Sequence, residues 1–180
     1  CLSLKFSGSN TLKAGTSKGV ADINLTNHKV TFHPLDFLAK NFISGNFITY
    51  LLKDKNNVWW LFPWRYGIWI TDSSCRNFHQ EFNNFLVEND RPKPLVIADA
   101  AEDKNGNLWF ADLDEGIIFY NSKTHTFSKP FTKWLGEQNS MSQILFYRDQ
   151  CFSFSGTDIY TWNPDNFQIE KINLPSQNDK

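Results

Sequence analysis

The sequence predicts an all-β protein, a β-propeller segment of four four-stranded blades. Three observations lead to this prediction. Aromatic residues make up 16% of the 180 residues, and aromatic side chains favour strands. A segment with four predicted strands recurs with a period of roughly 40–50 residues, which is the spacing of propeller blades. Helical periodicity is absent over any long window of the sequence.

The four copies stand in tandem. They read "NTLKAGTSKGVADINLTNHKVTF", "KDKNNVWWLFPWRYGIWITDSSCRNFHQEF", "EDKNGNLWFADLDEGIIFYNSKTHTFSKPF" and "YRDQCFSFSGTDIYTWNPDNFQIEKI". They predict blades at residues 1–42, 43–94, 95–138 and 139–180. A β-sandwich of unrelated hairpins is the alternative, but a sandwich does not need a constant period.

Each copy is expected to contain the same four strands in order. The first is apolar, as in "ITYLL", "VIADAA" and "ILFY", and an Asp/Asn/Gly turn such as "DKNGN" follows it. The second carries a large residue that fills the space between sheets, at Leu12, Trp59, Trp109 and Phe152. The third opens where a tight turn suits glycine, at Gly19, Gly67 and Gly116, with Asp158 in the fourth copy. The outer strand starts at an aromatic residue, at Phe32, Phe78, Phe127 and Phe167. Short helical turns can form at "PLDFLAK" and "FTKWLGE", between copies.

Composition narrows the choice of partners. The formal net charge is -1 and no basic run is present, so we expect no nucleic acid partner. No apolar stretch is long enough to cross a bilayer, so we expect no membrane contact by this segment. Cys1, Cys75 and Cys151 do not make a disulfide framework. Cys1 is either an ordinary apolar residue or a lipid-bearing cysteine, and the chain reads as a piece of a longer protein or a processed product.

The pattern D-x-x-G-x-L-W, then G-[IVL], then a short turn and an aromatic residue, is best developed between Asp103 and Phe127. It resembles the two-component regulator propeller repeat, and the resemblance covers nearly the whole chain. The resemblance implies a propeller of about seven blades, in the periplasmic sensor half of a membrane-bound histidine kinase, commonly a hybrid one of gut Bacteroidetes. Many members of that family sense oligosaccharides and control polysaccharide-utilisation genes. On this basis the chain is expected to be periplasmic, as part of an inner-membrane protein, and to sense without signalling alone.

Four copies are fewer than the family norm, so an open arc belonging to a larger propeller is expected. An arc leaves an exposed apolar blade face. The remaining blades or a second propeller chain would cover that face, and a homodimer is expected for the parent protein.

The predicted ligand face is formed by the loops that connect one blade to the next and by the loops between the second and third strands, "TSKG", "FPWRYG", "DLDEG" and "SGTD". An aromatic plate beside a guanidinium suits a sugar ring with a carboxylate or sulfate, and a lysine adds a point charge. The candidate ligand-binding residues are Lys18, Trp64, Arg65, Tyr66, Asp114 and Glu115. A plainer interpretation of "PWRY" is a rim where the aromatic residues pack on the next blade and Arg65 lies in solvent. A plainer interpretation of Asp114 and Glu115 is a solvated turn.

We expect the chain itself not to be an enzyme, with no catalytic residue, no metal and no cofactor. The four histidines lie in different copies without ligand spacing, and no serine-nucleophile motif or phosphate loop is present. Two alternatives stay open. One is a glycan lyase or hydrolase on a propeller fold, since glycosidases use two carboxylates. The other is a protein-interaction scaffold.

Overall fold

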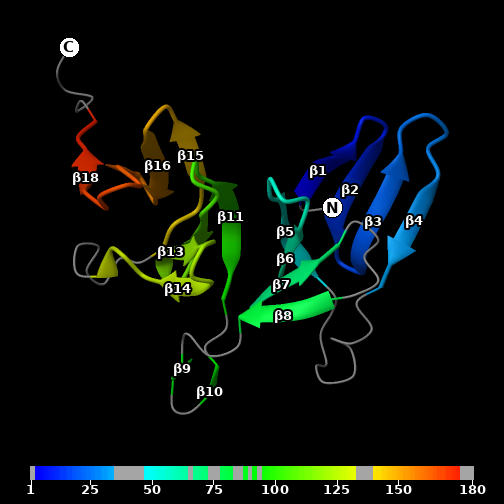
Figure 1. Cartoon of the computed structure of the whole chain (residues 1–180), viewed down its shortest axis with the longest axis horizontal. Helices are drawn as coiled ribbons and strands as arrows, with labels where there is room; N and C mark the ends of the chain where they lie inside the picture. Colours follow the sequence, from blue (N-terminus) through cyan, green and yellow to red (C-terminus); the bar gives the residue numbers. More distant parts are fainter. Residues whose placement is uncertain are drawn as a thin grey trace. The chain divides into compact units, whose positions relative to one another are not determined.

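The structure is a computed structural model of the chain (Figure 1). It describes residues 3–34, 47–64, 67–72, 78–82, 87–88, 91–92, 95–132 and 140–174, with backbone alone in 78–82, 87–88 and 91–92. The elements assigned in these ranges are β-strands. The chain forms two compact units, Cys1–Ile97 and Ala98–Lys180, and each is described by itself. The predicted helical turns fall wholly or largely outside the described residues.

The first unit contains two four-stranded sheets. In the first sheet consecutive strands pair antiparallel in the order β1 Ser3–Gly8, β2 Thr11–Thr16, β3 Gly19–Asn24 and β4 Val30–His33. The second sheet has β5 Ile48–Lys53, β6 Trp59–Pro63, β7 Ile68–Thr71 and β8 Phe78–Phe82 in the same order. A small ribbon that the sequence analysis did not foresee follows, with strands β9 Val87–Glu88 and β10 Arg91–Pro92.

The second unit repeats this plan. The third sheet has β11 Ile97–Glu102, which begins at the last residue of the first unit, then β12 Leu108–Asp112, β13 Gly116–Asn121 and β14 Thr126–Ser128. The fourth has β15 Ile144–Tyr147, β16 Gln150–Ser155, β17 Asp158–Trp162 and β18 Ile169–Ile172. Four four-stranded sheets in chain order confirm the predicted all-β, blade-like architecture. The blade boundaries themselves stay a prediction.

The glycines that open the third strands have the conformation that the sequence indicates. Gly19 and Gly116 are the first residues of β3 and β13 and have φ angles of 116° and 79°. Gly67 precedes β7 with a φ of 74°. A side chain would strain this backbone, so glycine permits the tight return of the chain.

In the first unit the two sheets pack face to face. Their shared core contains Val20, Ile48, Leu51, Trp59 and Leu61, each at most 1% exposed. Within this unit the Leu51 backbone N–H also donates to Ser3 Oγ at 3.2 Å, which ties β5 to β1. The sheets are therefore joined by both apolar packing and a side-chain hydrogen bond.

In the second unit the third and fourth sheets pack in the same way. Trp109 lies 5.6 Å from Trp162 and 4.6 Å from Phe119, measured between ring centroids, and all three side chains are buried. The Ile144 backbone N–H donates to Asp99 Oδ2 at 3.0 Å, so β15 is tied to β11 as β5 is tied to β1. Apolar packing and one hydrogen bond from a backbone N–H to a side chain therefore join the sheets in both units.

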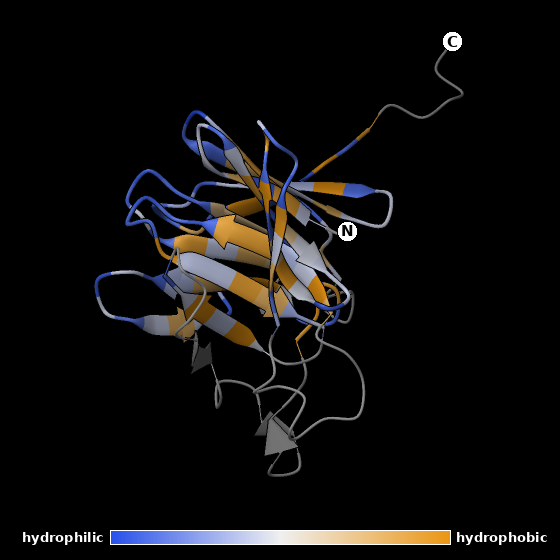
Figure 2. Cartoon of the chain, turned by 90° about the vertical axis from the view of Figure 1, so that its right-hand side faces the viewer, coloured by the Kyte–Doolittle hydropathy of each residue, from blue (hydrophilic) through white to orange (hydrophobic). Residues whose placement is uncertain are grey.

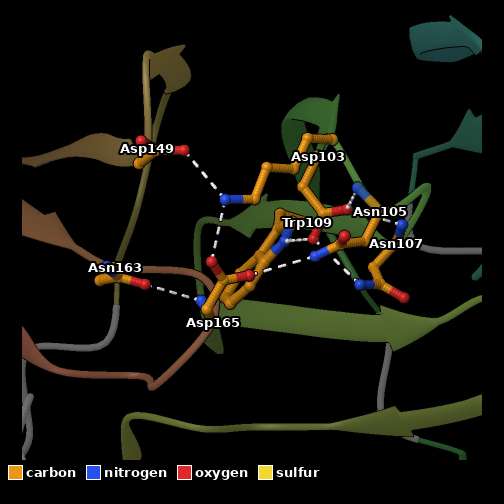
Figure 3. A network of polar contacts seen from close by, with 8 residues as sticks. Asp103, Asn105, Asn107, Trp109, Asp149, Asn163 and Asp165 are labelled. Carbon is orange, nitrogen blue, oxygen red and sulfur yellow. Dashed lines mark hydrogen bonds and ion pairs between the residues drawn. The ribbon is translucent and has the colours of Figure 1, made fainter.

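A buried aspartate fixes the turn before the second strand. Asp103 Oδ1 accepts from the backbone N–H groups of Asn105 and Asn107, and Oδ2 accepts from the Asn107 side chain and from Trp109 Nε1 at 3.1 Å (Figure 3). One carboxylate therefore holds the turn and orients the indole ring of the core. Lys104 on the same turn bridges exposed Asp149 and Asp165.

The second blade repeats this arrangement. Asp54 Oδ1 accepts from the backbone N–H groups of Asn56 and Val58, and Oδ2 accepts from Trp60 Nε1 at 2.9 Å. Trp60, not Trp59, is therefore the counterpart of Trp109, and the alignment that placed Trp59 there is wrong. Both tryptophans are buried, at 4% and 0% exposure, so apolarity alone does not distinguish them.

Three other sequence expectations are corrected. Phe167 does not start the outer strand, because it lies in the turn before β18 with a φ of 57° and packs on Trp109 at 5.7 Å. Leu12 and Phe152 are half-buried and do not fill a space between the described sheets. Trp162 of β17 fills that space in the second unit instead.

Replacing Gly15 with alanine is expected to lower the free energy of unfolding by about 1–3 kcal/mol. An added Cβ would lie 2.9 Å from Ile48 Cγ2 and 3.1 Å from the Ile48 carbonyl oxygen, so the two sheets would have to move apart. Urea unfolding followed by tryptophan fluorescence measures the change. Gly8→Ala is the matched control, because a Cβ there meets nothing within 4 Å. Equal stability of the two variants would contradict the close approach of the sheets.

Replacing Asp103 with alanine is expected to lower the free energy of unfolding by about 3 kcal/mol, because buried N–H donors lose their acceptor. The donors are Trp109 Nε1 and the backbone of Asn107 and Asn105. The control is Asp149→Ala, which removes an exposed ion pair and should cost at most about 0.5 kcal/mol. The same urea experiment compares them, and a loss no larger than that of the control would refute the role given to Asp103.

Candidate ligand-binding loops

The candidate residues lie on the turns that join the second and third strands of each sheet. In the second unit the segment before β15 reaches the same end, since the Met141 backbone N–H donates to the Asp112 carbonyl at 2.9 Å. The Ser142 backbone N–H likewise donates to the Phe154 carbonyl at 3.0 Å. Turns and blade-connecting segment therefore meet there, which is where a propeller offers variable residues to a ligand.

Trp64 is an exposed aromatic candidate, with 43% of its surface accessible. Its backbone N–H donates to the Phe47 carbonyl at 2.8 Å, and the two rings pack edge to face with centroids 6.3 Å apart. The hydrogen bond and the ring contact hold the indole in place while part of it stays accessible. An indole held in this way is suited to stacking on an apolar ligand surface.

Sequence analysis missed Phe47, which is 36% exposed and directly precedes β5. Its position before a first strand marks it as part of a blade-connecting segment. That position was the available signal, since the same analysis assigned such segments to the ligand face.

Lys18 is exposed in the turn between β2 and β3. Thr16 shapes this turn, because its hydroxyl accepts from the Lys18 backbone N–H at 3.1 Å and donates to the Gly19 carbonyl at 2.9 Å. The turn is thus fixed, and the residue that it carries, Lys18, is exposed. Lys18 and Trp64 belong to the same unit, and no hydrogen bond between their side chains is found in the part of the unit that the structure describes.

The acidic turn of the third sheet is organised by Asp112, which is fully buried. Its Oδ1 accepts from the backbone N–H groups of Asp114 and Glu115, at 2.8 and 2.7 Å. Glu115 is 6% exposed and pairs with Lys129, whereas Asp114 is exposed. The Glu115 carboxylate is therefore engaged inside the protein, and Asp114 is the carboxylate of this turn that solvent reaches.

Arg65 and Tyr66 lie outside the described residues. The carboxylates of the acidic turn do not form an open pair, because Asp112 is buried in its own turn and Glu115 is ion-paired. Among the described residues there is no cluster of three or more side chains suited to a metal ion. None of them belongs to a helix with the length and hydrophobicity needed to cross a bilayer.

The cysteines are described in part. Cys151 is a buried free thiol in β16, and burial raises its pKa well above the ordinary range. It is therefore a protonated, apolar member of the core beside Trp162. Cys1 and Cys75 lie outside the described residues.

The fold is similar to several solved structures. The extracellular domain of a proposed hybrid two component system from B. thetaiotaomicron has a TM-score of 0.74 at 17% identity, over 98% of this chain and 22% of the other. An auxiliary nutrient binding protein from Bacteroides thetaiotaomicron has a TM-score of 0.65 at 12% identity, over 93% of this chain and 40% of the other. The computationally designed Ika4 protein has a TM-score of 0.59 at 13% identity, with 90% and 89% of the two chains covered.

The chain thus spans about a fifth of the length of the first of these proteins. WD40 repeats of another protein also match, with a TM-score of 0.63 at 9% identity over 94% of this chain and 50% of the other. At such low identities the similarity establishes the propeller-type fold. No protein-family model matches the sequence, and no curated protein matches it.

Replacing Glu115 with glutamine is expected to lower the free energy of unfolding by about 2 kcal/mol, because Lys129 loses its carboxylate partner in a mostly buried pair. Asp114→Asn is the matched control on the same turn, and its exposed side chain should leave stability within about 0.5 kcal/mol. Chemical denaturation compares the two variants. Should Glu115→Gln prove as stable as the control, the internal role of Glu115 would be wrong.

Proposed function

We propose that this chain is a ligand-sensing propeller segment of a periplasmic two-component sensor. It recognises an oligosaccharide and, through a parent histidine kinase anchored in the inner membrane, controls polysaccharide utilisation. The observation that carries the ligand part is the accessible aromatic pair of Trp64 and Phe47 at the loop end of the second blade. The repeat pattern that ends at Phe127 carries the sensor part.

The comparisons support the proposal through two kinds of neighbour. One is the extracellular domain of a proposed hybrid two component system, and the other is an auxiliary nutrient binding protein. Both come from B. thetaiotaomicron, in agreement with the Bacteroidetes type that the sequence resembles. A sensor that meets nutrients outside the inner membrane would use such a fold for recognition.

The chemistry of the loops supports a sugar as the ligand. The C–H groups of a pyranose ring stack on an indole face, and Trp64 offers such a face. Lys18 in the same unit supplies a cation for a carboxylate or sulfate group. Arg65 and Tyr66, adjacent to Trp64 in sequence, remain proposed members of this site.

The proposed role is binding, with no chemistry by the chain itself. The acidic turn gives it little means for hydrolysis, because a glycosidase needs two carboxylates facing a substrate and those of Asp112 and Glu115 are engaged internally. A glycan lyase or hydrolase would reveal itself by releasing new reducing ends or unsaturated products from the bound glycans.

Trp64→Ala is expected to weaken oligosaccharide binding at least tenfold, about 1.4 kcal/mol, because the stacking surface is lost. An array of neutral, carboxylated and sulfated oligosaccharides identifies a glycan that the wild-type chain binds, and calorimetry then compares the variants. Phe47→Ala should weaken binding of the same glycan, since the Phe47 ring supports the indole of Trp64. Lys18→Ala should weaken binding of acidic glycans alone.

Leu25→Ala is the control, because Leu25 is a large exposed apolar residue beyond the other end of β3. It should bind as the wild type does. No binding to any glycan on the array, or equal losses for Trp64→Ala and Leu25→Ala, would argue against the proposed ligand class and site.

A further inference from the structure

The first sheet turns its apolar face away from the second sheet and its more polar face toward it. Strand pairing places Leu4, Ala14, Ala21 and Phe32 in one row and Phe6, Leu12, Ile23 and Val30 in the next, on the same face. These eight residues are all apolar. Phe6 is 69% exposed, Phe32 57%, Leu4 53% and Val30 45%. We call this surface the first outer face; Figure 2 shows apolar residues recurring along the strands of the first unit.

The opposite face of the same sheet carries mostly polar side chains, with Val20 as its apolar member in the core, and it is covered by the second sheet. Lys13 is 1% exposed, donates to Asp22 Oδ1 at 2.6 Å and stands 5.3 Å from the centre of the Trp59 ring. His33 Nε2 lies 2.9 Å from Asp22 Oδ2, and Lys5 donates to the Tyr50 hydroxyl at 2.7 Å. An antiparallel sheet with one free face normally turns its polar side to water. The reversal indicates that the first outer face is covered in the assembled protein.

The fourth sheet also has an exposed face with many apolar residues. One row contains Leu145 and Phe152 with the polar Thr161 and Glu170, and the next contains Phe154, Ile159 and Ile172. Leu145 is 63% exposed, and Tyr147 beside it is 59% exposed. We call this surface the last outer face.

Within each unit, one face of a sheet packs on the sheet that follows it in the chain, and the other face is of the type that packs on the preceding sheet. Positions along the strands show to which of these two types each outer face belongs. Phe152 stands three residues before the end of β16, as Trp109 stands three residues before the end of β12. Trp109 belongs to the face of the third sheet that packs on the sheet following it in the chain. The last outer face is therefore the kind that receives a following sheet.

The first outer face is the other kind. Ala14 stands two residues before the end of β2, and Ser153 stands two residues before the end of β16. Ser153 lies on the face of the fourth sheet that packs on the preceding sheet, together with Tyr160, its pairing partner. The first outer face is thus built to meet a preceding sheet.

We propose that the last outer face of one copy of this chain packs on the first outer face of a second copy, head to tail. The contact continues the stacking seen inside each unit, where a face of one kind always meets a face of the other kind. Both faces needed for it are on this chain. The first is apolar in both rows, and the last combines apolar side chains with Thr161 and Glu170, so the contact has an apolar core with polar groups beside it. A contact between two different surfaces of one protein is heterologous and leads to closed or extended oligomers. This inference is independent of the proposed ligand. The remaining blades of a larger propeller are the competing occupant of the two faces, and a monomeric wild-type chain would favour them.

The test begins with the mass of the purified chain in solution. Light scattering coupled to gel filtration should give at least twice the monomer mass of 20.9 kDa at micromolar concentration. Phe6→Asp on the first outer face and Leu145→Asp on the last outer face should each shift the chain to monomer, with at least a tenfold loss of self-association. Leu25→Asp, which charges an exposed leucine outside both faces, should keep the wild-type mass.

Mixing the two monomeric variants gives the decisive result. Phe6→Asp retains an intact last outer face and Leu145→Asp an intact first outer face, so an equimolar mixture should regain a dimer. A face that pairs with its own kind would not be rescued by mixing. Circular dichroism and thermal unfolding must show that both variants are folded.

A wild-type chain that stays monomeric overturns the proposal, as does a mixture of folded variants that fails to associate. Binding of oligosaccharide by the monomeric variants is measured separately. A wild-type chain that is monomeric but binds glycan would overturn the head-to-tail contact alone, and a wild-type oligomer that binds no glycan would overturn the ligand proposal alone.

Discussion

The structure of each unit depends on one constraint, namely that a twisted four-stranded sheet must bury its faces against another sheet. In the second unit this burial is achieved by Trp109, Phe119 and Trp162 from facing strands. In the first unit it is achieved by Trp59, with Ile48 close against the bare Cα of Gly15. Once the sheets are stacked, every turn lies at one of two ends of the stack. The turns are therefore free to vary, while the strands between them are not.

The aspartate before each second strand joins the turns to this packing. Asp103 satisfies N–H groups of its own turn and the indole of Trp109 with one carboxylate, and Asp54 does the same for Trp60. A turn held in this way fixes where the strand starts and hence which residues face the core. This explains why Asp and Trp recur together in the sequence at this spacing. Their role is structural, and the ligand proposal accordingly rests on the opposite turns.

The sequence predicted the strand order and the turn glycines because both follow from local chemistry: alternation within strands and left-handed backbone at turns. It could not decide between Trp59 and Trp60, since both are buried and only the hydrogen bond to Asp54 distinguishes them. It also could not foresee the pairing of Glu115 with Lys129, because these residues stand just before β13 and just after β14 and come together only when the two strands pair. Among the candidate site residues, the exposure of Trp64 and Lys18 agrees with a surface loop. The support that Phe47 gives to Trp64 needed coordinates.

The reversed polarity of the first sheet adds a statement about specificity. Lys13 and Asp22 form a largely buried ion pair against the Trp59 ring. A different sheet in the place of the second one would bury the Lys13 ammonium group without the Trp59 ring beside it, which is unfavourable. The junction inside the first unit therefore accepts the sheet that follows it and penalises a wrong register. The first outer face imposes no comparable polar requirement, since it carries apolar residues throughout. Apolar contact alone selects neighbours weakly, so specificity at this face must come from shape. On the first outer face Ala14 and Ala21 are buried between the exposed side chains of Leu4 and Phe32 in the same row, so the large side chains at the two edges determine the shape that an opposing sheet meets.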